Sequence, residues 1–130
     1  MTRTILIAAL ALAGCVAAPD SAGGVEPPRR PPDQPGVAYA QLNETVRIGN
    51  LTVRPLAVTE DSRCPSNVVC VWAGRVVLRV RVSGIGERTI SSIEPLALSG
   101  GGTLELASVW PPRVHGERPA GPYRFGFRRR

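Results

Sequence analysis

Few side chains of the types that perform catalysis occur in this 130-residue chain. It has one histidine, His115, three cysteines, and one adjacent pair of acids, Glu60 and Asp61. No serine lies in a nucleophile elbow, and no glycine-rich phosphate-binding loop is present. In a strand, Glu60 and Asp61 would point to opposite faces, which is wrong for two carboxylates that flank one bond. We therefore expect a non-catalytic protein that needs no metal ion or other cofactor.

Residues 1–14 predict a signal peptide, because a positively charged start precedes an apolar stretch too short to remain as a membrane span. They lead into the sequence L-A-G-C, which ends at Cys15. This resembles the bacterial lipoprotein signal, in which the cysteine is acylated and becomes the new amino terminus. The resemblance implies a diacylglycerol thioether on Cys15 and an amide-linked acyl chain, which together anchor stably. The alternative is an ordinary secretory signal, cleaved after Ala17 or Ala18.

The residue after Cys15 is Val16 rather than aspartate, which resembles the proteobacterial sorting pattern for the outer membrane. The expected address is therefore the bacterial cell envelope, lipid-anchored and facing the periplasm. Residues 15–40 would form the lipidated cysteine and a disordered Pro-rich linker, and residues 41–130 the folded domain. The run from Pro27 to Pro32 could bind a proline-recognition domain, although a spacer is the favoured interpretation.

Net charge and location together restrict the partners. The formal charge of +6 would permit binding to nucleic acid, anionic lipid or another polyanion. An extracytoplasmic address excludes nucleic acid. The membrane, reached through the lipid anchor, and an envelope protein or polyanion remain.

Cys64 and Cys70 are the two cysteines left if Cys15 is lipidated. In an oxidising compartment, this pair predicts a disulfide. A metal site would need closer cysteine spacing and more ligands, and His115 is distant in sequence, so a disulfide is favoured over a metal site or free thiols. Closing a seven-residue ring would stabilise the fold by about 2 kcal/mol on the chain-entropy model.

A long alternating pattern follows this segment. From Cys70 to Ser83 the even positions are mostly apolar, while arginines occupy odd positions. Because successive strand side chains point to opposite faces, the pattern predicts one strand with an apolar and a cationic face. Trp72 and Trp110 each fall on the apolar phase of a predicted strand, which favours core anchors over ligand-binding platforms.

Shorter patterns separated by turns predict further strands, and Gly49 and Asn50 predict a hairpin turn into the strand that starts at Leu51. Pro55 cannot donate a ladder hydrogen bond, so its strand should be an edge strand or contain a bulge. The fold class is therefore all-β, a small antiparallel sandwich or barrel of about six strands. The other expected strands are 41–48, 51–58, 89–93, 103–110 and 123–128.

The segment from Asp61 to Gly74 reads D-S-R-C-P-x₄-C-V-W-A-G. It resembles a motif of small uncharacterised envelope proteins and lipoproteins of Gram-negative bacteria. The resemblance implies an exported β-domain with a cysteine-closed loop. It implies no substrate and no catalytic role.

The expected function is that of a membrane-tethered accessory or binding domain. One alternative is a protease-inhibitor-like or other protein-partner-binding domain, which would present the rigid loop with Ser66 and Asn67 exposed. Another is binding of lipopolysaccharide-type polyanions by an arginine-rich strand face, for which the simpler interpretation is a charged face that keeps the domain soluble. The arginines of that face would be Arg75, Arg79, Arg81, Arg124 and Arg128.

Overall fold

The computed structural model describes residues 31–119 and 121–130. The predicted signal peptide, Cys15 and the linker as far as Arg30 lie outside the described residues. No helix in the described part of the chain is long and apolar enough to span a bilayer.

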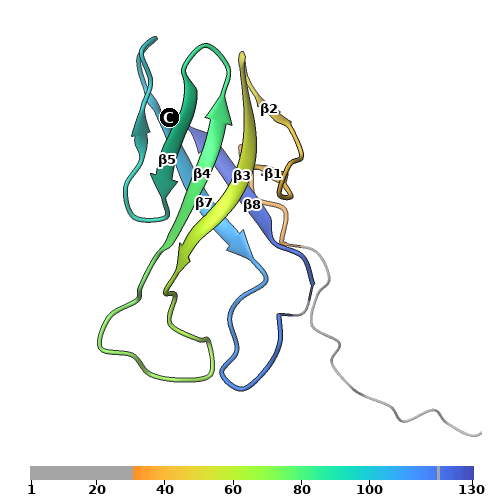
Figure 1. The fold of residues 1–130 in the computed structure, drawn as a ribbon, viewed down its shortest axis with the longest axis vertical. Coiled ribbons are helices and arrows are strands. Elements are labelled where there is room, and N and C mark those ends of the chain that lie inside the picture. The colour runs from red at the N-terminus through yellow and green to blue at the C-terminus, as the bar shows by residue number, and fades with distance from the viewer. Residues whose placement is uncertain (1–30, 120) are drawn as a thin grey trace, which may run out of the picture.

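The described residues form eight strands in two four-stranded antiparallel sheets. One sheet has the strand order β1-β8-β7-β6 and the other β2-β3-β4-β5, and the two lie one behind the other (Figure 1). This confirms the all-β prediction and resolves it as a sandwich of two separate sheets. The strands are β1 (Ala38–Ala40), β2 (Val46–Ile48), β3 (Leu51–Asp61), β4 (Val76–Val82), β5 (Gly86–Ser91), β6 (Leu96–Ala97), β7 (Thr103–Trp110) and β8 (Arg124–Arg129).

The core lies between the sheets and is built from the inward phase of the strands. In β4, Val76, Leu78, Val80 and Val82 are all buried and alternate with more exposed residues, as the period-2 pattern predicts. Aliphatic side chains of this size each stabilise the fold by roughly 1.5–3 kcal/mol when buried. The full set of buried apolar residues is Ala40, Ile48, Val53, Val76, Leu78, Val80, Val82, Ile90, Leu98, Leu104, Leu106, Phe125 and Phe127.

Two turn and bulge predictions are confirmed. Gly49 and Asn50 connect β2 to β3, with Ile48 directly opposite Leu51. Pro55 lies in β3, which has neighbours on both sides, and the register shifts between Pro55 and Ala57. Pro55 lies beyond residues 51–53, the part of β3 that pairs with β2, so an open side of the strand and the adjacent bulge together accommodate its missing amide.

The domain begins earlier than the predicted boundary at Gln41. Strand β1 pairs with β8 and lies inside the segment assigned to the linker. Ala40 is fully buried, and the Tyr39 hydroxyl donates a hydrogen bond to the carbonyl oxygen of Pro32 at 3.2 Å. Strands β1 and β6 have three and two residues, too few for alternation to reveal them, so eight strands form where about six were expected.

The central strand begins at Val76, so the prediction that it starts at Cys70 is wrong. Gly74 has a φ of +69°, which only glycine adopts readily, and its α-carbon packs against the backbone of Ser62. This turn makes residues 62–75 a loop. Trp72 therefore lies outside the strand and is 66% exposed, so the prediction that it anchors the core is also wrong.

Trp110 is not a core anchor either. The register of β7 shifts between Leu106 and Ser108 where it pairs with β8, and such a bulge reverses which residues face inward. Val109 consequently packs against the core, while Trp110 is half-buried and outside the core cluster. The bounds 103–110 predicted for this strand are confirmed.

Candidate functional site

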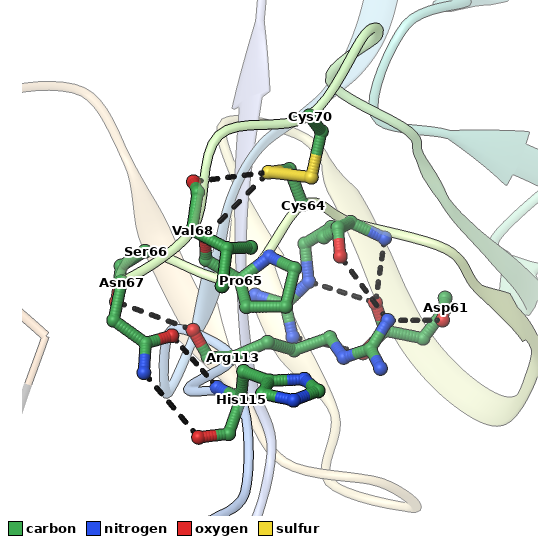
Figure 2. The surroundings of a disulfide bond; sticks show 10 residues. Asp61, Cys64, Pro65, Ser66, Asn67, Val68, Cys70, Arg113 and His115 are labelled. Atoms are coloured by element: carbon green, nitrogen blue, oxygen red, sulfur yellow. Dashed lines mark hydrogen bonds and ion pairs between the residues drawn. A yellow bond between two sulfur atoms is a disulfide. The ribbon is translucent and has the colours of Figure 1, made fainter.

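The strongest candidate site lies at one end of the sandwich, where two long loops meet (Figure 1). The cysteine loop, residues 62–75, joins β3 to β4. The proline loop, residues 111–119 and 121–123 as described, joins β7 to β8. Cys64 and Cys70 form a disulfide with their α-carbons 5.9 Å apart, which confirms the predicted pair (Figure 2).

Backbone bonds close the base of the cysteine loop. The Ser62 amide donates to the Arg75 carbonyl at 2.8 Å, and the Cys64 amide donates to the Ala73 carbonyl at 2.8 Å. These bonds continue the β3–β4 pairing beyond the strands, so the loop leaves the sheet as a two-chain stem. The disulfide then closes the outer part of the loop.

Polar residues of the cysteine loop tie it to the proline loop (Figure 2). The Ser66 amide donates to the Arg113 carbonyl at 2.8 Å. Asn67 and His115 bond reciprocally: the His115 amide donates to Asn67 Oδ1 at 2.8 Å, and Asn67 Nδ2 donates to the His115 carbonyl at 3.3 Å. Ser66 and Asn67 are exposed, as expected, yet their polar groups hold the two loops in register.

A cluster of Asp61, Arg63 and Tyr123 at the end of β3 connects the bases of the two loops. Arg63 Nε and Nη2 donate to the two carboxylate oxygens of Asp61 at 2.9 and 2.8 Å. The Tyr123 hydroxyl donates to Asp61 Oδ2 at 2.7 Å. Burial acts to raise the pKa of Asp61, but these donors outweigh it and hold the pKa below its ordinary value. Burial, and then the bond to Asp61, raise the pKa of Tyr123.

Two arginines, Arg63 of this cluster and Arg113 of the proline loop, also donate hydrogen bonds to backbone carbonyls of other segments. Arg63 Nη1 donates to the carbonyls of Val109 and Pro111 at 3.0 and 3.1 Å. Arg113 Nη1 donates to the carbonyls of Asp61 and Arg63, both at 3.1 Å. Each guanidinium thus spans the gap between loops, and planar donor groups of this kind are well suited to such bridging.

The outer part of this braced loop carries an apolar tip, consisting of Val68, Val69, Val71 and Trp72. Val69 and Val71 are fully exposed, Trp72 is 66% exposed and Val68 is 40% exposed. The tip was not predicted from the sequence, because the alternating pattern placed Val71 and Trp72 in a strand. The available signal was the run V-V-C-V-W between the turn-forming Pro65 and Gly74, which is compatible with a loop as well as with a strand.

A hollow of about 300 Å³ lies beside the disulfide loop. Arg63 and Pro65 form its wall on the side of the cysteine loop, and Tyr123 and most of the proline loop form the rest. A concave surface with a few fixed polar groups is the usual form of a recognition site.

The predicted arginine face is divided between the two sheets. Arg124 and Arg128 lie on β8, which pairs with β1 and β7 and not with β4, so they do not extend the face of β4. Most of these arginines also have carboxylate partners: Arg75 with Glu60, Arg79 and Arg81 with Glu87, and Arg128 with Glu105. The hydrogen bond from Arg75 lowers the pKa of Glu60, and the bond from Arg128 lowers that of Glu105.

The two adjacent acids take separate partners, Glu60 with Arg75 and Asp61 with Arg63. Within residues 31–119 and 121–130, no three His, Cys, Asp or Glu side chains gather in an arrangement that could hold a metal ion. Comparison with known proteins found no family model, no curated protein and no solved structure that matches this chain.

Proposed function

We propose that this chain is a lipid-tethered, non-catalytic binding domain of the bacterial envelope, which presents the apolar tip of its cysteine loop to a protein partner. One observation carries the proposal: Val69, Val71 and Trp72 are exposed on a loop that a disulfide and two arginine bridges hold in place. Apolar side chains exposed to water on a braced loop are unfavourable in the free protein. Covering them with a partner removes this apolar surface from water and so favours binding.

The bracing favours tight binding. Association normally requires free energy to order mobile side chains and loops, and a preorganised loop avoids much of that cost. Burying each valine of the tip would contribute roughly 1.5–3 kcal/mol, and exposed tryptophans are enriched among the residues that dominate binding energy. The adjoining hollow, bounded by Arg63 and Tyr123, offers a second contact for the same partner.

A protein is favoured over the bilayer as the occupant of the tip. A fluid bilayer selects for apolar area and neighbouring basic charge rather than for a fixed shape. Arg63 and Arg75, the two cations of the cysteine loop, are already paired with carboxylates, and Arg113 of the proline loop is engaged with the carbonyls of Asp61 and Arg63. The reciprocal bonding of Asn67 and His115 fixes loop geometry, which matters for a partner with a complementary surface.

Site-specific photocrosslinking tests the proposal. Benzoylphenylalanine would replace Val69 in the full-length protein expressed in its bacterial host. The matched control position is Ile93, which is 63% exposed but lies in the connection between β5 and β6, away from the tip. We expect a discrete protein crosslink from position 69 and none from position 93.

A second substitution links the crosslink to the tip. Trp72→Ser should reduce the yield from position 69 several-fold while changing the free energy of unfolding by less than about 0.5 kcal/mol, since Trp72 is outside the core. The same products from positions 69 and 93, or adducts from position 69 to lipid alone, would overturn the protein-partner proposal.

A further inference from the structure

A second unusual feature lies at the other end of the sandwich, on the outer face of the β2-β3-β4-β5 sheet. Arg54 on β3 lies directly opposite Arg81 on β4. Their strand neighbours Val53 and Val82 are buried in the core, so both arginines lie on the outward phase. Like charges directly opposite each other in a sheet are destabilising.

Arg54 differs from Arg79 and Arg81, the two arginines of β4, which both pair with Glu87. Arg54 Nε is buried and makes no hydrogen bond. Among the described residues, it forms no ion pair, whereas Arg81 Nη2 contacts a Glu87 oxygen at 2.6 Å. A buried donor without an acceptor is costly, so the Arg54 side chain would gain stabilisation if its guanidinium found an acceptor.

A hollow of about 550 Å³ adjoins the two arginines. Thr45, Thr52 and Ser83 line it, together with the turn from Gly84 to Gly86. Ser83 Oγ accepts a bond from the Thr52 amide at 2.9 Å, which leaves its own proton available to donate. Guanidinium and hydroxyl donors around one space match the acceptor oxygens of a tetrahedral anion.

The surrounding charge is positive. Arg47 lies opposite Thr52 on the same outward phase, and Arg79 is two residues before Arg81 on β4. Glu87 provides the one carboxylate paired with this group in the described part of the chain, and Arg79 and Arg81 share it. The local excess of positive charge would attract an anion to the hollow.

We propose that this hollow is a binding site for a phosphoryl group, with the guanidinium groups of Arg54 and Arg81 and the Ser83 hydroxyl as donors. The ligand is a phosphomonoester, carried either by a soluble compound or by a lipid headgroup. The site is separate from the apolar tip, because the β4–β5 turn and the cysteine loop lie at opposite ends of the sandwich (Figure 1). It also differs from the cationic face predicted from sequence, since Arg54 was not among those residues.

The test is a titration of the full-length protein in neutral detergent micelles with inorganic phosphate, followed by NMR of the arginine Nε–H groups. We expect a saturable shift of the Arg54 resonance with a Kd of about 1 mM or below. Arg81→Gln should abolish saturation. The matched control is Arg88→Gln, which removes an exposed arginine that bonds to the Glu87 carbonyl, and it should leave the titration unchanged.

Thermal unfolding gives an independent readout. In low-salt, phosphate-free buffer, Arg54→Gln should raise the Tm, because it removes one of two opposed charges. Phosphate should raise the Tm of the unmodified protein and not that of Arg54→Gln. No saturable shift, or an equal phosphate-dependent rise in both proteins, would overturn the proposal.

Micelles doped with phosphatidic acid or phosphatidylcholine distinguish the two ligand sources. If phosphatidic acid alone displaces inorganic phosphate from the Arg54 site, the ligand is a lipid headgroup. If phosphate stays bound in both micelles, the ligand is a soluble phosphoryl compound. Both results support the site, whereas absence of binding by phosphate and phosphatidic acid alike rejects it.

Discussion

Replacing Arg63 by methionine should loosen both loops at once, because its guanidinium joins the end of β3 to the segment from Val109 to Pro111. Arg63 pairs with Asp61 through two bonds and donates to the carbonyls of Val109 and Pro111. The two charged side chains are only 18% and 12% exposed, so water cannot readily replace the lost partner. Methionine keeps most of the apolar stem and removes only these bonds.

The loss of stability in Arg63→Met depends on how far the Asp61 carboxylate is left without a partner. Breaking a buried ion pair by removing one partner costs about 3–5 kcal/mol. The Tyr123 hydroxyl still donates to Asp61, and the pair retains some contact with solvent, so we expect about 3 kcal/mol for Arg63→Met. Asp61→Asn added to Arg63→Met should recover part of this loss, because it removes the uncompensated charge.

Urea unfolding measures the effect. With a slope of about 1–3 kcal/mol per molar for a small domain, Arg63→Met should lower the midpoint by about 1–3 M. The control is Arg79→Met, whose contact with Glu87 is 3.9 Å long and solvent-exposed and should contribute about 0–1 kcal/mol. If Arg63→Met costs no more than Arg79→Met, the bracing of the two loops by Arg63 is refuted.

Three further predictions concern the same end of the fold. Substituting Cys64 and Cys70 together by serine should lower the stability of the oxidised protein by about 2 kcal/mol; thermal unfolding with and without reductant checks this, and equal melting of variant and oxidised parent would contradict it. Because the folded pKa of Asp61 is depressed, its contribution is fully present above its ordinary pKa of 3.8 and is lost as the pH falls below that value. Urea midpoints from about pH 5 to about pH 2 should therefore decline less steeply in Asp61→Asn, and identical slopes would count against the pairing. Gly74→Ala should destabilise more than Gly84→Ala in urea, since both have positive φ but only at Gly74 would a Cβ overlap the backbone of Ser62; equal losses would remove that contact from the explanation.

The fold class was predictable because period-2 alternation is strong wherever a strand has one buried face. The strand Thr103–Trp110 and the Gly49–Asn50 turn were both predicted with their observed positions. Alternation says nothing of bulges, however. The register shift after Leu106 changed the face of the sheet to which Trp110 points, and no residue type in that segment indicates a bulge.

The candidate site was only partly predictable. The Cys64–Cys70 bond followed from the number of cysteines and their inferred compartment, whereas the end of the loop depended on backbone geometry at Gly74. A glycine within an apolar alternation is compatible with a strand or with a turn, and the contact with Ser62 that decides between them is non-local. Trp72 is exposed because the chain turns at Gly74 instead of continuing as a strand.

Cross-strand pairing was the least predictable element. Arg54 and Arg81 are far apart in sequence, and only the β3–β4 register places them opposite each other. The same register brings Glu60 close to Arg75 and so neutralises part of the expected cationic face. Such pairs depend on which residue opposes which, and one bulge changes every pairing beyond it.

The tether and the closed loop together underlie the proposed function, and one measurement tests both. Intact mass would be determined for the protein purified from bacterial membranes, before and after reduction and alkylation. We expect a chain that starts at Cys15 with acyl additions and gains two alkylatable thiols, on Cys64 and Cys70, only after reduction. An unacylated chain with another start, or thiols that react without reduction, would contradict the proposal of a lipid-tethered domain with a rigid binding loop.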